Sequence, residues 1–320
     1  MYSTVSSEAE DKKVTESAAK KPSPRSGKIK QIWKENREGW MFVAPLVIGL
    51  AIFTLYPMIQ SLIWSFFNYT GAIYYYPVGL GNFRYMFATD PVFWKVLGNT
   101  VFYAFVSVPI VLVSSYLLAT LVNLPYKSVG AFRVIYYLPC VIPGVVSGLL
   151  WKDMFAANGV FNQFLGLFGL HSQFFESESS WTAISSIFLM NMWSIGGGMI
   201  LWLSAYKAIP VQLYEAEKID GAGKIQRFLN VTIPMSFPMI FFNVVTMLIG
   251  TLQYNGTLTY AYNGQGYRNS LYMFAVLIYN EAFVNSKYGY ASALSWFLLI
   301  FIGILTAVLF FARSKIYRED

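Results

Sequence analysis

Long apolar runs separated by short polar segments dominate the chain from residue 40 onward. Six of these runs are long enough for an α-helix to cross a bilayer, which takes about 20 predominantly apolar residues. They lie at about 40–67, 97–122, 131–151, 181–206, 233–255 and 291–312. The pattern therefore predicts an all-α integral membrane protein with six transmembrane helices.

Two segments depart from a plain run of apolar residues. The third run contains Pro139, Pro143 and Gly144, and such helix breakers are tolerated where neighbouring helices cover the freed backbone groups. After the fifth run, the segment 271–283 (LYMFAVLIYNEAF) is apolar but short, with polar residues on both sides. We expect it to form a helix that lies on the protein or on the outer face of the membrane.

The first 38 residues have a different composition from the rest of the chain. They are rich in serine, glutamate, lysine, alanine and proline, and they cannot bury enough apolar surface to fold alone. They contain no apolar core of the kind found in a cleavable signal peptide. We therefore expect a flexible cytosolic tail at 1–38, with 28–38 (KIKQIWKENRE) as a candidate surface helix, followed by a transmembrane domain at 39–320.

Composition excludes several classes of protein. The chain is 56% hydrophobic and 12% charged, whereas soluble domains average about 25% charged residues. With one cysteine, Cys140, it cannot form an intramolecular disulfide, and with one histidine, His171, a zinc site built from Cys and His is excluded. The net charge of +7 is explained by loop lysines and arginines, so no nucleic-acid partner is expected.

Lysine and arginine are distributed unevenly between the two sets of loops. If the N-terminus is cytosolic, 18 of the 23 basic residues lie in cytosolic segments and 5 in outer segments. Without the N-terminal tail the bias is still 9 to 5. Since the cytosolic loops of membrane proteins are enriched in lysine and arginine, we expect both termini to be cytosolic.

One cytosolic segment, 215–234 (EAEKIDGAGKIQRFLNVTIP), is the most charged part of the second half of the chain. Pro210 suits the start of a helix, and Gly221 and Gly223 suit a break in it. A second helical segment at 224–231 then leads into the fifth run, which predicts a helix–turn–helix on the inner side. The alternative is an amphipathic helix lying on the membrane, and the mixed charges and the two glycines weigh against it.

This segment resembles the EAA motif of the permease subunits of binding-protein-dependent ABC importers. The matching residues are Glu215, Ala216, Asp220, Gly221, Ala222, Phe228, Val231, Ile233 and Pro234, and the spacing from Gly221 to Val231 fits. Glu217 stands where the family has its second alanine. Further segments resemble the maltose/glycerol-3-phosphate branch of the type I importers, and together they extend over about 40–315: 79–87, 98–103, 132–143, 158–166 and 288–296.

The resemblance implies the six-helix type I permease fold in a bacterial cytoplasmic membrane. It also implies a coupling helix at about 210–223 that sits in a surface cleft of an ATPase subunit and transmits its closure. The implied coupling residues are Glu215, Ala216, Glu217, Asp220, Gly221, Ala222 and Phe228. The implied partners are a second homologous permease, two ABC ATPase subunits and an extracytoplasmic solute-binding protein, which the outer loops at 68–83 and 256–290 would meet.

The chain lacks the machinery for hydrolysing ATP itself. A P-loop reads G-x-x-x-x-G-K-[ST], and the two Gly-Lys pairs, Gly27-Lys28 and Gly223-Lys224, are both followed by isoleucine. We therefore expect no bound cofactor here, with ATP and Mg in partner ATPase subunits. The alternatives are an ATP-independent secondary transporter and an intramembrane enzyme, and the near absence of ionisable residues in the apolar runs weighs against both.

Polar residues inside the spans are candidates for a solute path. Aromatic faces and amides suit a sugar, and the candidates are Asn191, Trp193, Asn243, Gln253 and Tyr254. Amides also hold helices together, and the glycines at 196–198 favour helix packing or a kink over recognition. Since Arg133, near the start of the third run, is the only basic residue in the six runs, we expect a carbohydrate, an oligosaccharide in particular. The alternative is glycerol-3-phosphate or another small polar solute.

Overall fold

The computed structural model describes residues 39–71, 75–124, 129–174, 177, 179–254 and 265–316. The predicted tail at 1–38 and the part of the outer loop at 256–264 lie outside the described residues. The chain divides into two compact units, Met1–Ser61 and Leu62–Asp320. The described part of the first unit belongs to one long helix, and the candidate functional residues all belong to the second.

The first long helix, Gly39–Trp64, matches the first predicted span. Ala51–Leu55 within it is a π-helical segment (η1), and Tyr56–Trp64 is α3. None of its most hydrophobic stretch is buried within the chain. Apolar side chains of this kind need lipid or another protein chain around them, because the free energy of exposing so large an apolar surface to water is unfavourable.

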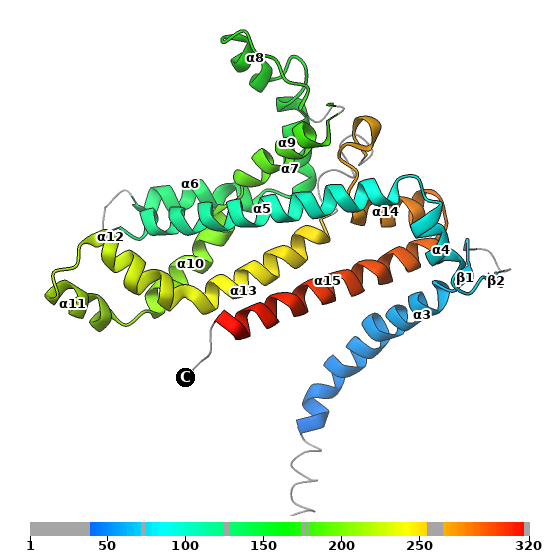
Figure 1. Ribbon diagram of the computed structural model, residues 1–320, viewed down its shortest axis with the longest axis horizontal. Helices are drawn as coiled ribbons and strands as arrows, with labels where there is room; N and C mark the ends of the chain where they lie inside the picture. The colour runs from blue at the N-terminus through cyan, green and yellow to red at the C-terminus, as the bar shows by residue number, and fades with distance from the viewer. Residues whose placement is uncertain are drawn as a thin grey trace, which may run out of the picture. The chain divides into compact units, whose positions relative to one another are not determined.

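The second unit is built almost entirely of helices (Figure 1). A small antiparallel pair, β1 (Phe67–Asn68) and β2 (Tyr76–Pro77), precedes them. The helices that follow are α4 (Gly81–Ala88), α5 (Phe93–Val122), α6 (Val129–Val141), α7 (Gly144–Met154), α8 (Val160–Gly166), α9 (Ser180–Met192), α10 (Gly196–Ala208), α11 (Val211–Ile219), α12 (Lys224–Arg227), η3 (Phe228–Thr232), α13 (Ile233–Leu252), η6 (Tyr267–Asn269), α14 (Phe274–Tyr279), η7 (Asn280–Val284) and α15 (Tyr288–Ile316).

Within the described ranges, four helices are long and apolar enough to cross a membrane by themselves. They are Gly39–Trp64, Phe93–Val122, Lys224–Leu252 and Tyr288–Lys315, and they correspond to the first, second, fifth and sixth predicted runs. Two bent helix pairs raise the number to six if each pair counts as one span. The protein is thus mostly helical, with four to six apolar helices.

The third and fourth runs are not the continuous helices that the apolar pattern predicts. The third consists of Val129–Val141 and Val146–Met154, bent by 100°, and the fourth of Trp181–Met192 and Gly196–Ala208, bent by 53°. Pro143 precedes α7 and has an extended ψ of 137°, so the α6 helix cannot continue through it. The second break falls just before Gly196, where the chain passes close to α6.

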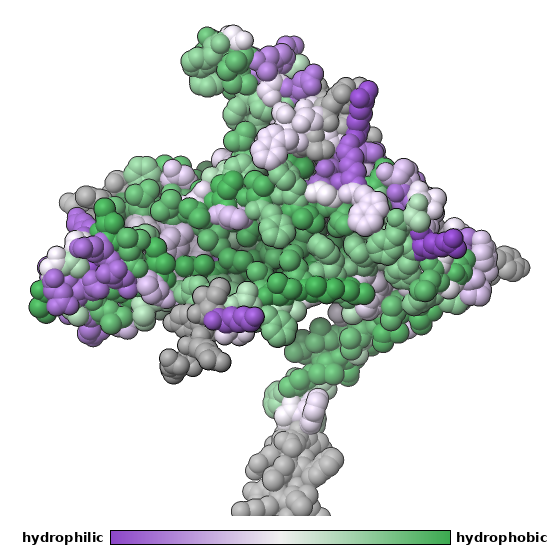
Figure 2. Space-filling view, viewed as in Figure 1, coloured by the Kyte–Doolittle hydropathy of each residue, from purple (hydrophilic) through white to green (hydrophobic). Residues whose placement is uncertain are grey.

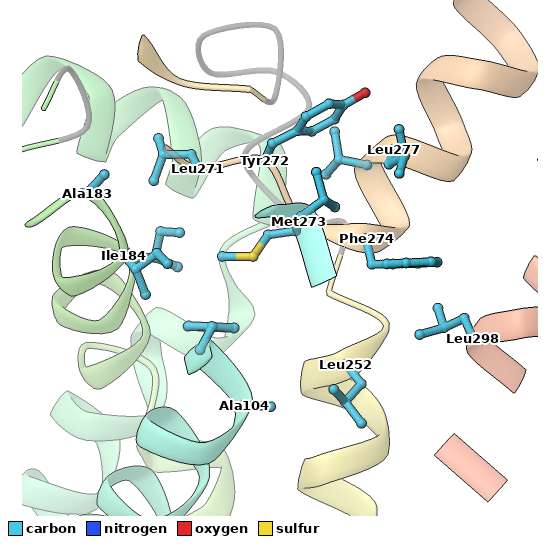
Figure 3. Packing of buried hydrophobic residues seen from close by; sticks show 14 of the residues in the cluster. Ala104, Ala183, Ile184, Leu252, Leu271, Tyr272, Met273, Phe274, Leu277 and Leu298 are labelled. Carbon is cyan, nitrogen blue, oxygen red and sulfur yellow. The ribbon is translucent and has the colours of Figure 1, made fainter. Parts of the chain in front are cut away.

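The larger hydrophobic core joins α5, α9, α13, α14 and α15. Side chains from these helices point toward one another in Figure 3, with Ile184, Leu252 and Phe274 among them. The segment from Leu271 to Phe274 is fully or almost fully buried. The apolar segment predicted to lie on the protein does so: it forms α14 and η7, and α14 packs against α5 and α15.

Two polar side chains of α5 fasten this outer segment. The amide of Asn99 donates to the carbonyl oxygens of Asn269, Ser270 and Tyr272 at 3.1, 3.3 and 3.2 Å. The hydroxyl of Thr100 accepts a hydrogen bond from the backbone N–H of Phe274 at 2.8 Å. These bonds satisfy backbone groups that would otherwise be buried without partners.

Candidate functional site

The helix–turn–helix predicted in the charged segment is present as α11 and α12. Helix α11 begins after Pro210, whose fixed φ of −59° suits a position at the start of a helix. It ends at Ile219, and Lys224 begins α12. Both short helices lie at one end of the second unit, beside the last turns of α5 and α10 (Figure 1).

The turn after α11 depends on the backbone of Gly221. Its φ is +81°, in the left-handed region where L side chains are strained. The backbone N–H of Ala222 donates to the carbonyl of Glu217 at 2.9 Å, and that of Gly221 to the carbonyl of Lys218 at 3.2 Å. This pair of bonds is a Schellman motif, which satisfies the last carbonyls of the helix and requires the left-handed residue.

The second glycine of the segment opens the next helix. The backbone N–H of Gly223 donates to the side-chain oxygen of Gln226 at 2.8 Å, while its carbonyl accepts from the N–H of Arg227 at 3.0 Å. Helix α12 then continues through the π-helical turn η3 into α13 without a break. Any displacement of the turn is therefore carried directly into a membrane-spanning helix.

Two aromatic side chains, Tyr214 and Phe228, pack this hairpin against α5 and α10. Tyr214 of α11 and Phe228 pack against a second buried cluster that includes Tyr116, Trp202 and Val231. The hydroxyls of Tyr214 and Thr232 are 3.0 Å apart and share a hydrogen bond. Since the cluster contains side chains of α5, α10 and η3, the hairpin packs together with the neighbouring ends of these helices.

The implied coupling residues fall into two groups by exposure. Glu215, Ala216, Asp220 and Gly221 are exposed, whereas Glu217, Ala222 and Phe228 are partly buried. None of the three carboxylates forms an ion pair with another described residue. Figure 2 shows hydrophilic residues gathered at this end of a molecule whose broad helical face is hydrophobic. Phe228 points into the packed cluster, so its contribution is to seat the hairpin rather than to contact a partner.

Exposed apolar side chains accompany these charges on α11. Val211 is 64% exposed and Ile219 is 86% exposed, and Leu213 is exposed as well. Ala216 lies between them in the sequence and leaves room for close approach. A short helix with a small residue, free carboxylates and bare aliphatic side chains has the character of a docking surface for another protein.

The structure brings together two of the five candidate residues of the solute path. The amide of Asn191 donates to the hydroxyl of Tyr103 and to the carbonyl of Ile187. The ring of Tyr103 lies 5.4 Å from the ring of Tyr254, measured between centroids. Asn191 and Tyr254 thus meet through a residue of α5 that the sequence analysis did not single out.

The other three candidates lie elsewhere. Trp193 packs edge-on against Trp151, with ring centroids 5.7 Å apart. Asn243 is buried in α13 and donates to the carbonyl of Met239 in its own helix at 2.9 Å. Gln253 is exposed at the end of α13. Ten residues of helix, about 15 Å, separate Asn243 from Gln253, so these two do not line one compact site.

Tyr103 also borders a pocket of about 280 Å³ between α5 and α9. Aromatic rings of Phe102, Trp181 and Phe188 line it, together with the hydroxyls of Ser107 and Ser185. The exposed surface of this pocket is almost wholly apolar, so its rings suit the apolar face of a sugar but it offers little for the sugar's hydroxyl groups. A tyrosine in the middle of an apolar run is the signal that would have identified Tyr103 from the sequence.

Comparisons with known proteins identify the family. No protein-family model matches the chain. It is 33% identical over 294 residues to the probable ABC transporter permease protein YesP of Bacillus subtilis, covering 90% of this chain and 94% of that one. It is 34% identical over 282 residues to the lactose transport system permease protein LacF of Rhizobium radiobacter, with 87% and 94% covered. The chain therefore belongs to the family of ABC transporter permease proteins.

Solved structures share its fold. A chain of a bacterial ABC transporter involved in the import of the acidic polysaccharide alginate matches with a TM-score of 0.77 and 23% identity, covering 90% of this chain and 100% of that one. A second structure of the alginate transporter, in complex with an alginate pentasaccharide-bound periplasmic protein, matches with a TM-score of 0.76.

Proposed function

We propose that this chain is the transmembrane permease subunit of an ATP-driven carbohydrate importer, with an oligosaccharide as its solute. The observation that carries the proposal is the structure of the α11–α12 hairpin. Its exposed surface contains unpaired carboxylates and aliphatic side chains, and Tyr214 and Phe228 pack it against α5 and α10. Relatives named for lactose transport and for permease function support the choice of solute class.

Coupling follows from this geometry. ATP binding closes a pair of ATPase subunits, and each ATPase pulls on the coupling helix that sits in its cleft. Because the hairpin packs together with the neighbouring ends of α5, α10 and α13, the pull moves these helices together and the cavity alternates between inward and outward access. Glu215, Ala216 and Asp220 contact the ATPase, Gly221 shapes the turn, and Phe228 transmits the load to the cluster.

We place both termini in the cytosol of a bacterial cell, with the transmembrane domain at 39–320 in its cytoplasmic membrane. Each bent pair then counts as one span, which gives six. The excess of lysine and arginine on the proposed inner side supports this orientation. The polar hairpin lies at the ends of α5 and α10, as a cytosolic element of such a protein should.

The partners follow from the same assignment. A second permease completes the translocation path, two ATPase subunits supply the energy from ATP and Mg, and a solute-binding protein delivers the sugar from outside. The alginate transporter that shares the fold has been solved with a periplasmic protein bound, which supports a partner of this kind. The outer segment held by Asn99 and Thr100 is well placed to meet it, because it is fixed to α5 at the end away from the hairpin.

Uptake into proteoliposomes tests the function. The chain reconstituted with its partner permease, its ATPase and the binding protein should take up a labelled oligosaccharide only when ATP is inside. The chain alone should take up nothing under a proton or sodium gradient. Gradient-driven uptake by the lone chain would support a secondary transporter. ATP-driven uptake of glycerol-3-phosphate, without uptake of any sugar, would support an importer of glycerol-3-phosphate in place of a carbohydrate importer.

The solute path makes a residue-level prediction. Asn191→Ala should raise the KM for uptake about fivefold and leave ATP-driven turnover near normal, because one hydrogen bond to a neutral hydroxyl contributes about 1 kcal/mol. Ser204→Ala is the matched control, since that hydroxyl is exposed and bonds only to the carbonyl of Ile200 in its own helix. Equal KM values for the two variants would remove Asn191 from the path.

A further inference from the structure

A second pocket, of about 440 Å³, lies where three spans reach the same side of the second unit. It is open, and its lining comes from the end of α5, the last turns of α10, the hairpin, and η3. The lining residues include Leu124, Tyr214, Lys224, Arg227 and Thr232. The function proposed above makes no use of this pocket as a binding site.

The charge of the lining has one sign. Lys224 and Arg227 contribute two cations, and no carboxylate lines the pocket. The Nε atom of Arg227 is buried and has no hydrogen-bond partner among the described residues. A buried guanidinium nitrogen without an acceptor is costly, because the group loses water and gains no partner. The side chains of Lys224 and Arg227 also form no hydrogen bond or ion pair with another described residue, so an anion in the pocket would give both cations a partner.

The hydroxyl groups of the lining leave one proton for a ligand. The hydroxyls of Thr120 and Tyr206 lie 2.9 Å apart, and each is 3.0 Å from the carbonyl oxygen of Tyr116, so both of their protons are used within this group. Tyr214 and Thr232 share a single hydrogen bond, which uses one of their two protons. The remaining proton can be donated to an oxygen in the pocket.

An apolar stripe on α5 leads to the mouth of this pocket. Ile110, Val113, Leu117 and Leu121 recur at intervals of three and four residues within α5 and are all exposed. Side chains at this spacing lie on one face of the helix. The stripe therefore runs along α5 toward the turn that follows the helix, where the exposed Leu124 lines the pocket.

We propose that the pocket binds an anionic phospholipid. Lys224, Arg227 and the free hydroxyl proton of the Tyr214–Thr232 pair hold the phosphate of the headgroup, and an acyl chain lies along the α5 stripe. The ends of α5, α10 and α13 mark the boundary of the membrane, which is the depth at which lipid phosphates lie. Basic pockets between spanning helices are sites where anionic headgroups bind.

The acyl chain distinguishes this occupant from free phosphate. A free phosphate or glycerol phosphate would use the cations but not the stripe of exposed leucines, whereas a phospholipid uses both. An acidic segment of a protein partner would also match the cations, but it would leave the α5 stripe without an occupant. The continuity of the cationic pocket with the apolar stripe therefore favours a lipid.

Retention of lipid on the full-length chain tests the proposal. The chain is reconstituted into nanodiscs of phosphatidylcholine with phosphatidylglycerol, extracted into mild detergent, and weighed intact by native mass spectrometry. Wild-type protein should retain phosphatidylglycerol. In the double variant Lys224→Gln with Arg227→Gln, the amount of retained phosphatidylglycerol should fall by at least about tenfold. Lys224→Arg with Arg227→Lys should retain it, which separates loss of charge from loss of fold.

Lys207→Gln with Lys315→Gln is the matched control. It also removes two exposed basic residues from the inner ends of spans, neither of which lines the pocket. This control should retain phosphatidylglycerol like the wild type, and inorganic phosphate or glycerol phosphate should not displace the lipid. Equal losses in both double variants would mean unspecific attraction and would overturn the proposal.

Two further outcomes would also overturn it. Complete displacement by inorganic phosphate would identify a free-anion site. Unchanged lipid retention in Lys224→Gln with Arg227→Gln, together with loss of co-purifying ATPase, would assign the pocket to a protein contact. The lipid measurement uses no solute and no ATP, so it can succeed or fail independently of the importer function proposed above.

Discussion

Replacing Gly196 with alanine should abolish the folded protein. A Cβ atom at this position would lie 2.5 Å from the carbonyl carbon of Tyr136 and closer still to its oxygen. These are backbone atoms of α6, so no side chain can turn aside to make room, and α6 and α10 would have to separate. We expect a loss of more than about 4 kcal/mol in the free energy of unfolding, the range of severe core lesions.

The neighbouring glycine provides the control. A Cβ atom at Gly197 would lie 3.6 Å from the Sγ atom of Cys140, an ordinary contact. Alanine is also favoured over glycine inside a helix by about 1 kcal/mol. Gly197→Ala should therefore match or exceed the wild type in yield of monodisperse protein and in Tm, while Gly196→Ala fails in both. Similar yields for the two variants would contradict the close crossing of α6 and α10.

Replacing Gly221 with valine should uncouple ATP hydrolysis from transport. The left-handed conformation costs an ordinary L residue about 1–2 kcal/mol, and a β-branched side chain more. The Schellman turn would be displaced, and with it the exposed surface of α11. In the reconstituted complex we expect uptake to fall by at least about tenfold, while the chain itself stays folded because Gly221 has open space around it.

Asparagine at the same position separates the backbone from the side chain. Asn is tolerated in the left-handed region, so Gly221→Asn should keep most of the uptake activity although it adds a larger polar group. Substrate-stimulated ATPase activity and uptake are measured together for both variants. If Gly221→Val transports normally, the turn has no role in coupling. If Gly221→Asn is as inactive as valine, a partner contact at this point, and not the backbone, is what matters.

Much of the fold could be predicted from the apolar pattern. Four of the six runs are single long helices, although Pro109 lies inside α5 and Pro238 inside α13. Apolar helices of this kind tolerate an interior proline where neighbouring groups satisfy the freed backbone carbonyl. The charged segment was also predictable, since Pro210 and Gly221 mark the ends of α11 by restricting and releasing the backbone. The segment 271–283 was predicted to lie on the protein or on the outer face of the membrane, because it is too short for a span. The structure shows the first of these, with α14 packed against α5 and α15.

The two bends were only partly predictable. Pro139, Pro143 and Gly144 indicate where a helix is weak, but the 100° bend between Val129–Val141 and Val146–Met154 depends on packing that no local pattern encodes. The glycines at 196–198 were assigned to packing or a kink, and both occur: the break falls at Trp193–Ile195, and Gly196 meets the backbone of Tyr136.

The candidate sites differ in the same way. The candidate coupling segment is contiguous in the sequence, so its residues could be named together. The hairpin exposes Glu215, Ala216, Asp220 and Gly221 but packs Phe228 against the buried cluster. The candidate residues of the solute path come from different helices that are far apart in the sequence. Asn191 and Tyr254 meet only through Tyr103, while Asn243 bonds to its own helix, and neither fact can be read from a single run.

Cross-linking from α11 tests the central claim that this helix docks on an ATPase. The chain has one cysteine, so Cys140→Ser gives a background without cysteine. Ala216→Cys in that background, with a short thiol–amine linker on the purified importer, should cross-link to the ATPase subunit. Thr89→Cys, which is exposed near α4 at the far end of α5, should not. An active importer in which Ala216→Cys never reaches the ATPase, or reaches it no more than Thr89→Cys, would contradict the account.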